Sequence, residues 1–127
     1  MRRVVLVLTS LLFVCFGATY AQMKVQNPVR WSTSVQERDS VIELVAKAQI
    51  EAPYHLYSCF LPEGGPTPTT FSFKEDARYQ LVGEVEEIGK AHEEFDEVFN
   101  LNLKMYGDSV NFVQRIKRNS GEAFTIA

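Results

Sequence analysis

Apolar and more polar residues alternate along the middle of the chain. Ile42, Leu44, Ala46, Ala48 and Ile50 are every second residue of one segment. A period of two places alternate side chains on one face of a β-strand. Glu, Leu, Ala and Lys also favour helix, but the strict alternation favours a strand over residues 42–50.

Other segments carry the aromatic and β-branched residues typical of strands. The pattern predicts strands at residues 29–35, 54–60, 69–73 and 79–86. Six or seven short strands separated by turn signals predict an all-β domain, either a sandwich or a barrel.

A hairpin over residues 98–117 is the strongest local prediction. Gly107-Asp108 suits a two-residue turn with glycine at the position that needs a positive φ. That turn sets the register, in which seven of the eight inward side chains are apolar. The predicted pairs are Met105 with Val110, Leu103 with Phe112, Leu101 with Gln114, and Phe99 with Ile116.

The first 21 residues have the pattern of a secretory signal peptide. Arg2 and Arg3 precede an apolar run over residues 4–16, and small residues end at Ala21. The run is shorter than the roughly 20 residues that span a membrane. We therefore expect a signal peptide at 1–21, cleavage before Gln22, one domain at 22–127, periplasmic export and no transmembrane segment after cleavage.

Charge and cysteine content reduce the number of functions that the chain could have. Without Arg2 and Arg3, 11 basic residues remain against 16 acidic ones, a formal net charge of −5. This balance argues against a nucleic-acid partner, which would need a basic face. Cys59 is the one cysteine after residue 21. It is therefore free, buried or paired with another molecule.

No catalytic residue, metal site or cofactor site is predicted. His55 and Cys59 share strand parity, but four extended residues span roughly 13 Å. The favoured interpretation of Cys59 is a small, half-buried hydrophobic residue. His55 and His92 lack a metal-ligand spacing. The acidic segment 92–97 is expected to be a charged loop, in which Phe95 is either buried or covers something. A hydrolase is least favoured, because no nucleophile and base can be named.

Several motifs lie at residues 27–31, 55–58, 60–69 and 94–96. Together they resemble one family, the N-terminal periplasmic domain of the thiol:disulfide interchange protein DsbD, or disulfide-bond corrector domain. The family-motif residues are Trp31, Tyr54, His55, Tyr57, Pro62, Gly64, Gly65 and Pro66.

The resemblance implies an immunoglobulin-like antiparallel β-sandwich. Such a domain passes electrons by thiol-disulfide exchange to periplasmic disulfide isomerases and cytochrome c maturation proteins. Phe95 falls at the place of a cap-loop aromatic that shields the reactive cysteines. Glu93 and Glu94 would flank that cap, and Asp96 belongs to the same cap-loop-like segment.

The chain departs from the family at its cysteines. The family's cysteine pair lies on a late hairpin, and this sequence reaches Ala127 before such a pair. Exchange through an internal disulfide needs two sulfurs, so we expect no redox activity. A sandwich lacking its last strands would expose an edge, so we expect a product that is marginally stable or self-associates. The alternative is a secreted protein-binding β-sandwich without redox chemistry, using residues 84–97 or 62–68 as its contact surface.

Overall fold

The computed structural model describes residues 27–119, 121 and 124–126. The predicted signal peptide lies outside these residues. The described residues form seven strands and no helix. In chain order the strands are β1 (Val29–Arg38), β2 (Val41–Ile50), β3 (Leu56–Tyr57), β4 (Tyr79–Gly89), β5 (His92–Asp96), β6 (Leu101–Tyr106) and β7 (Ser109–Arg118).

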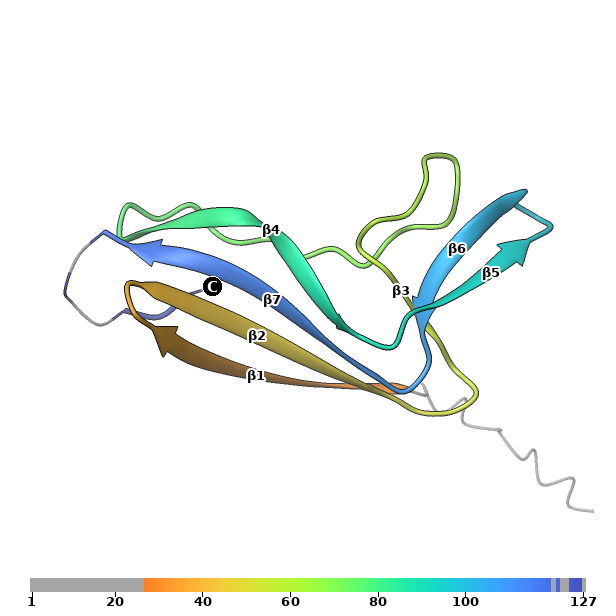
Figure 1. The fold of residues 1–127 in the computed structure, drawn as a ribbon, viewed down its shortest axis with the longest axis horizontal. Helices are drawn as coiled ribbons and strands as arrows, with labels where there is room; N and C mark the ends of the chain where they lie inside the picture. Colours follow the sequence, from red (N-terminus) through yellow and green to blue (C-terminus); the bar gives the residue numbers. More distant parts are fainter. Residues whose placement is uncertain (1–26, 120, 122–123, 127) are drawn as a thin grey trace, which may run out of the picture.

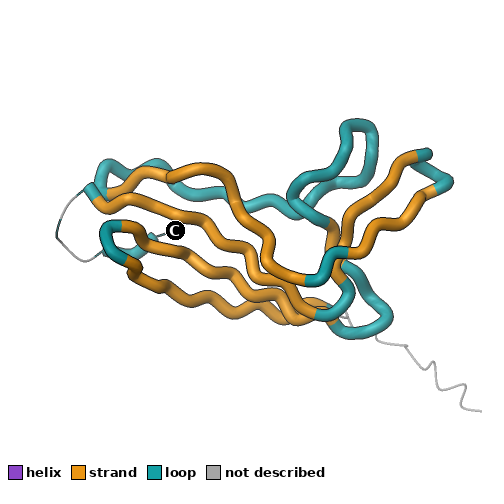
Figure 2. The backbone as a smooth tube through the Cα atoms, in the orientation of Figure 1, coloured by secondary structure: helices purple, strands orange, loops and turns teal. Residues whose placement is uncertain are grey.

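The strands form two antiparallel sheets (Figure 1). The larger sheet has the order β1-β2-β7-β4, and the smaller has the order β3-β6-β5. The predicted all-β, antiparallel class is confirmed, and two sheets are consistent with a β-sandwich. The smaller sheet lies at one end of the larger one, where β5 and β6 lead away from it (Figure 2).

The strand predicted from alternation at residues 42–50 is confirmed as β2. Its even-numbered residues face the same side as Phe112 and Ile116 of β7. Ala48, Phe112 and Ile116 are almost completely buried there. We call this side of the larger sheet its inner face. The strands predicted at 29–35 and 79–86 are also confirmed, as β1 and β4.

The predicted hairpin turn at Gly107-Asp108 is wrong. β6 and β7 belong to different sheets, so Met105 pairs with Tyr57 and His92, whereas Val110 pairs with Ala48 and Gly89. Among the described glycines, a positive φ occurs at Gly64 and Gly83 but not at Gly107. Burial of most of the apolar side chains was nevertheless predicted correctly: Leu103, Met105, Val110, Phe112 and Ile116 are buried.

The actual turn lies at residues 97–100, between β5 and β6. The Asp96 carboxylate accepts hydrogen bonds from the Val98 and Phe99 amides at 2.8 and 3.1 Å. Asn100 has a φ of 55°, a conformation that asparagine tolerates well. The acidic segment predicted as a charged loop is therefore mostly strand β5, because its backbone pairs with β6.

Together β4–β5 and β6–β7 make one long antiparallel ribbon that bends at residues 90–91 and 107–108 (Figure 1). Gly89 lies just before the bend, opposite Val110. A Cβ atom at position 89 would lie 2.9 Å from the Ser109 carbonyl oxygen and 3.2 Å from the Val110 Cα. The bend therefore requires a residue without a side chain at this position.

Two further strand predictions need correction. The segment 69–73 has no strand, and 54–60 is a strand only over Leu56–Tyr57. The reason is local bonding, because Thr69 bonds back across the base of its own loop. Its amide donates to the Ser58 carbonyl at 3.3 Å, and its hydroxyl donates to the Tyr57 carbonyl at 2.6 Å.

Candidate functional site

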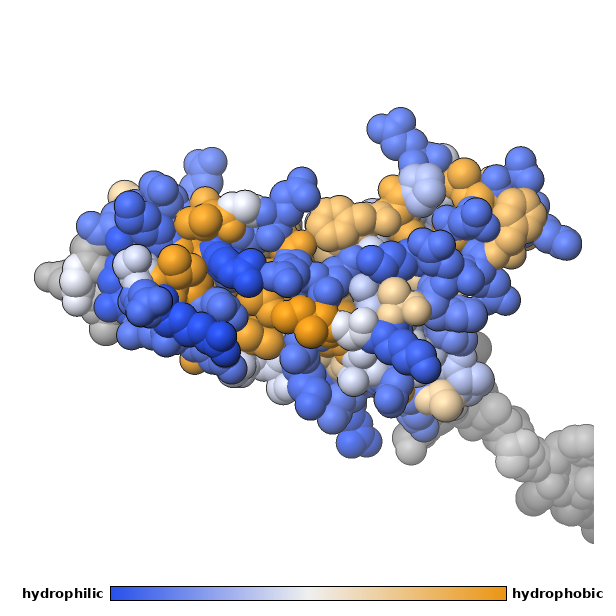
Figure 3. Space-filling view, viewed as in Figure 1, coloured by the Kyte–Doolittle hydropathy of each residue, from blue (hydrophilic) through white to orange (hydrophobic). Residues whose placement is uncertain are grey.

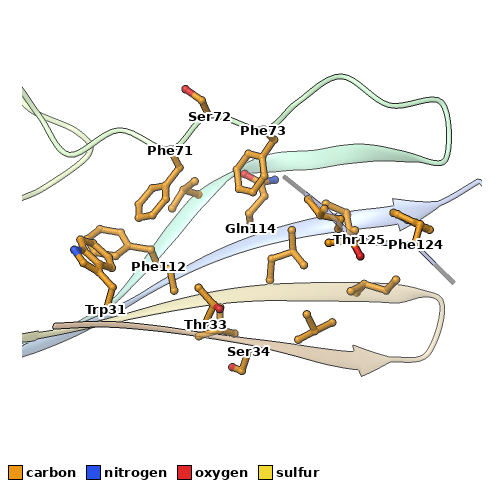
Figure 4. A pocket seen from close by; sticks show the side chains of 18 of the residues that line it. Trp31, Thr33, Ser34, Phe71, Ser72, Phe73, Phe112, Gln114, Phe124 and Thr125 are labelled. Carbon is orange, nitrogen blue, oxygen red and sulfur yellow. The ribbon is translucent and has the colours of Figure 1, made fainter.

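A groove of about 650 Å³ lies on the inner face of the larger sheet. Its lining is mainly apolar and comes from all four strands and from two segments laid across them. In Figure 4 the labelled side chains of Trp31, Phe112 and Gln114 rise from the strands, and Phe71 and Phe73 descend from the covering loop. Figure 3 shows hydrophobic residues gathered over this sheet between hydrophilic ones.

Three aromatic rings form one end of the groove. The ring centroids of Phe71 and Phe112 are 4.9 Å apart, and Trp31 lies 5.9 Å from each. These separations fall in the range of favourable tilted and edge-to-face aromatic contacts. Trp31 is still 46% exposed, so this end of the groove is only partly closed.

The segments across the groove share one pattern. Phe71 and Phe73 are half-buried and two residues apart, as are Phe124 and Ile126. Phe124 also stacks on Tyr79, with ring centroids 5.8 Å apart. Two segments of the chain therefore pack against the inner face of the larger sheet, each through apolar residues at positions i and i+2.

The amide and the cation in the groove lining are already bonded. The buried Gln114 amide donates to the carbonyls of Gly83 and Arg115 at 3.2 and 2.9 Å. Gly83 lies where β4 bulges out of register with β7. Arg118 is the one charged residue among the described lining residues, and Glu37 pairs with it at 2.8 Å. The groove is therefore suited to apolar groups rather than ions.

A buried carboxylate joins the two sheets. The Glu87 side chain, on β4, is 3% exposed. It accepts hydrogen bonds from the fully buried Ser58 hydroxyl and from the Cys59 amide, the latter at 3.3 Å. Lys104 of β6 approaches it to 4.0 Å. Buried carboxylates persist when they are paired in this way, so Glu87 holds the smaller sheet against the end of the larger one.

Cys59 packs against the main core cluster beside this carboxylate. Burial, reinforced by the negative charge of Glu87, raises the pKa of the thiol to about 11. The thiolate is the form that attacks disulfides and binds metals. The predicted interpretation of Cys59 as a small, half-buried residue agrees with this environment. No described residue forms a disulfide with it.

The structure brings His55 and His92 together, which their spacing in the sequence does not indicate. Their rings stack with centroids 6.3 Å apart. His55 directly precedes β3 and His92 begins β5, and both strands pair with β6, so the two rings meet across that strand. His92 also lies 3.8 Å from Glu94. Within the described ranges, no group of three or more His, Cys, Asp or Glu side chains is arranged to hold a metal ion.

The cap-loop-like residues lie together on one strand. Glu93, Glu94, Phe95 and Asp96 all belong to strand β5. Phe95 is 55% exposed, so it is not tucked into the core.

The family-motif residues are spread over separate places. Trp31 lies in the groove, Tyr54 and His55 precede β3, and Tyr57 is half-buried within it. Pro62, Gly64 and Pro66 lie in the loop after β3, where Gly64 has a φ of 86°. Gly65 of that loop faces the side chains of Leu101 and Leu103. Of the family-motif residues, Trp31 alone is among the residues that line the groove.

Comparisons with known proteins give no relative for this chain, because no protein-family model, curated protein or solved structure matches it. Among the described residues, no helix is long and apolar enough to cross a membrane.

The pKa of Cys59 predicts slow alkylation. At pH 8 in a Cys15→Ser background, iodoacetamide should modify the native chain about a hundredfold more slowly than the urea-unfolded chain, because so little thiolate is present. Glu87→Gln should shift the pH midpoint of alkylation downward but not below the ordinary value of 9.0, since burial remains the larger cause.

Glu86→Gln is the control for this measurement. Glu86 precedes Glu87 but is half-exposed and pairs with Arg115 at 2.8 Å, so its loss should leave the midpoint unchanged. A native chain that reacts as fast as the unfolded one would contradict the environment assigned to Cys59.

Proposed function

We propose that this protein is a non-catalytic binding module that holds an extended, apolar polypeptide segment in the groove of its larger sheet. The observation that carries the proposal is the groove itself, an apolar space of about 650 Å³ on an incompletely covered sheet face. This volume falls within the range of natural ligand sites, which are mostly apolar with a few placed polar groups.

The chain's own packing argues for a polypeptide ligand. Two of its segments already lie across this sheet with apolar side chains at i and i+2, namely Phe71 with Phe73 and Phe124 with Ile126. Side chains of an extended chain alternate between its two faces. A partner with the same alternation would place its apolar residues in the groove and its polar residues in water.

The charge pattern favours an apolar over an anionic ligand. Arg118 is the one cation among the described lining residues, and Glu37 already neutralises it. Most of the lining residues between Trp31 and Ile116 offer aromatic rings and aliphatic side chains. Recognition would therefore depend on burial of apolar surface, which contributes a favourable free energy of about 25 cal/mol per Å² buried.

A second candidate is an exported, redox-inactive relative of the disulfide-bond corrector domain, with an immunoglobulin-like sandwich and a periplasmic location. The motifs around Tyr57 and Pro62 support it, and so does the all-β, antiparallel fold. The raised pKa of Cys59 supports the absence of redox activity. In this case the partners would be periplasmic thiol-disulfide proteins.

Trp31 provides a direct test of groove binding because it is the only tryptophan in the chain. Titration with a synthetic peptide that alternates leucine and serine should shift its emission to shorter wavelength, since a bound segment excludes water from the indole. Leu44→Lys should weaken peptide binding at least tenfold, because it places a charge in the apolar lining.

Ile88→Lys is the matched control. Ile88 is also apolar, but it pairs with Asn111 on the opposite face of the sheet and is 51% exposed. It should leave the affinity unchanged, and thermal melts of both variants would establish that they fold. Equal affinities for wild type and Leu44→Lys, or no emission change with the wild type, would contradict the proposal.

The redox aspect has a separate test. The purified chain should not catalyse reduction of insulin disulfides by dithiothreitol above the uncatalysed rate, because a single half-buried thiol cannot cycle through an internal disulfide. Steady turnover that is lost in Cys59→Ser would refute inactivity. Binding to a periplasmic oxidoreductase, unaffected by Leu44→Lys, would favour the second candidate over the first.

A further inference from the structure

We infer that the outer edge of β1 pairs with β1 of a second copy of this chain, in an antiparallel register centred on Thr33. The two larger sheets would then form one continuous sheet across a two-fold axis. This inference goes beyond the proposed function and does not depend on it, because it rests on backbone groups and on the sequence of β1.

The direction of the backbone groups follows from one hydrogen bond. The Pro28 carbonyl accepts from the Glu51 amide at 2.9 Å, in the same register as the β1–β2 pairing. Hydrogen-bonded pairs alternate along an antiparallel ladder. The even-numbered residues of β1 therefore bond to β2, and Trp31, Thr33 and Val35 direct their N–H and C=O groups to the outer edge.

Within the part of the chain that the structure describes, residues 31–36 at the centre of β1 lack the features that usually protect an edge strand. Such protection comes from prolines, charges, bulges or a covering segment. Residues 31–36 contain no charge and no proline, and the pairing of β1 with β2 is regular throughout. The other edge of the sheet is different. There β4 bulges between Val82 and Glu86 and carries several carboxylates.

The sequence of β1 is self-complementary in one register. With Thr33 opposite Thr33 of the second copy, Trp31 lies opposite its Val35, and Ser32 lies opposite its Ser34. Threonine pairs and aromatic–β-branched pairs are favourable cross-strand neighbours. A shift that pairs Thr33 with Val35 instead places Arg30 opposite Arg38, and like charges in direct opposition are destabilising.

This register also buries apolar surface. Trp31 and Val35 are 46% and 64% exposed, and both line the groove. The inner-face side chains of one copy would meet those of the other at the axis, so the two grooves would become continuous. The contact involves a single strand from each copy, and small interfaces of this kind are weak and reversible.

Sedimentation velocity tests the pairing. The wild type should show a reversible, concentration-dependent monomer–dimer equilibrium. Thr33→Lys should weaken dimerisation at least fivefold, because it places two ammonium groups opposite each other at the axis. Ile88→Lys adds the same charge on β4 at the other edge, opposite the uncharged Asn111, and should have no effect. A wild type that stays monomeric at millimolar concentration would overturn the inference, as would Thr33→Lys dimerising like wild type.

Disulfide trapping tests the register independently of any folding defect in Thr33→Lys. In a Cys15→Ser, Cys59→Ser background, the double variant Ser32→Cys, Ser34→Cys should oxidise to a covalent dimer. Its opposed Cα atoms would lie about 4.5 Å apart, within reach of a disulfide. Each single variant should crosslink much less. Equal crosslinking by the single variants and the double variant would overturn the register. The peptide titration would still test binding in the groove separately.

Discussion

The bend in the β4–β5/β6–β7 ribbon is the constraint on which the rest of the structure depends. Both strands of the ribbon leave the larger sheet at the same level, where Gly89 approaches the backbone of Ser109 and Val110. Two residues earlier, Glu87 connects β4 to Ser58, Cys59 and Lys104. A close backbone contact and a buried carboxylate thus fix where the smaller sheet begins.

The open groove is a consequence of that bend. Because β5 and β6 lead away from the larger sheet, they do not lie across its whole inner face (Figure 1). The described residues cover that face with the loop containing Phe71 and with the segment containing Phe124. Incomplete cover leaves a mostly apolar surface exposed, and such surfaces on folded proteins commonly mark binding sites.

Part of the fold could be predicted from the sequence because local pattern determines it. The alternation around Leu44 defined β2, and the apolar residues around Phe112 were correctly expected to be buried. The partner of each strand could not be predicted in this way. Gly107-Asp108 has the composition of a hairpin turn, but β7 pairs with β2 and β4 instead of β6. The hairpin turn lies at residues 97–100, where the Asp96 side chain caps it.

The candidate site was predicted less well for the same physical reason. Trp31 was singled out as a motif residue, but its place in a groove depends on Phe71 and Phe112, which are distant in sequence. Glu87 gave no signal at all, because a buried carboxylate in a strand of mixed polarity resembles its exposed neighbours. Its role follows from Ser58 and Lys104, which the bend brings to it.

The stability of Gly89→Ala is the most direct test of the bend. The added methyl group would meet the Ser109 carbonyl at 2.9 Å, so urea unfolding should show a loss of about 1–3 kcal/mol. Gly121→Ala, where a Cβ meets no atom within 4 Å, should change the free energy of unfolding by less than about 0.5 kcal/mol. A Gly89→Ala variant as stable as the Gly121→Ala control would contradict this account of the fold.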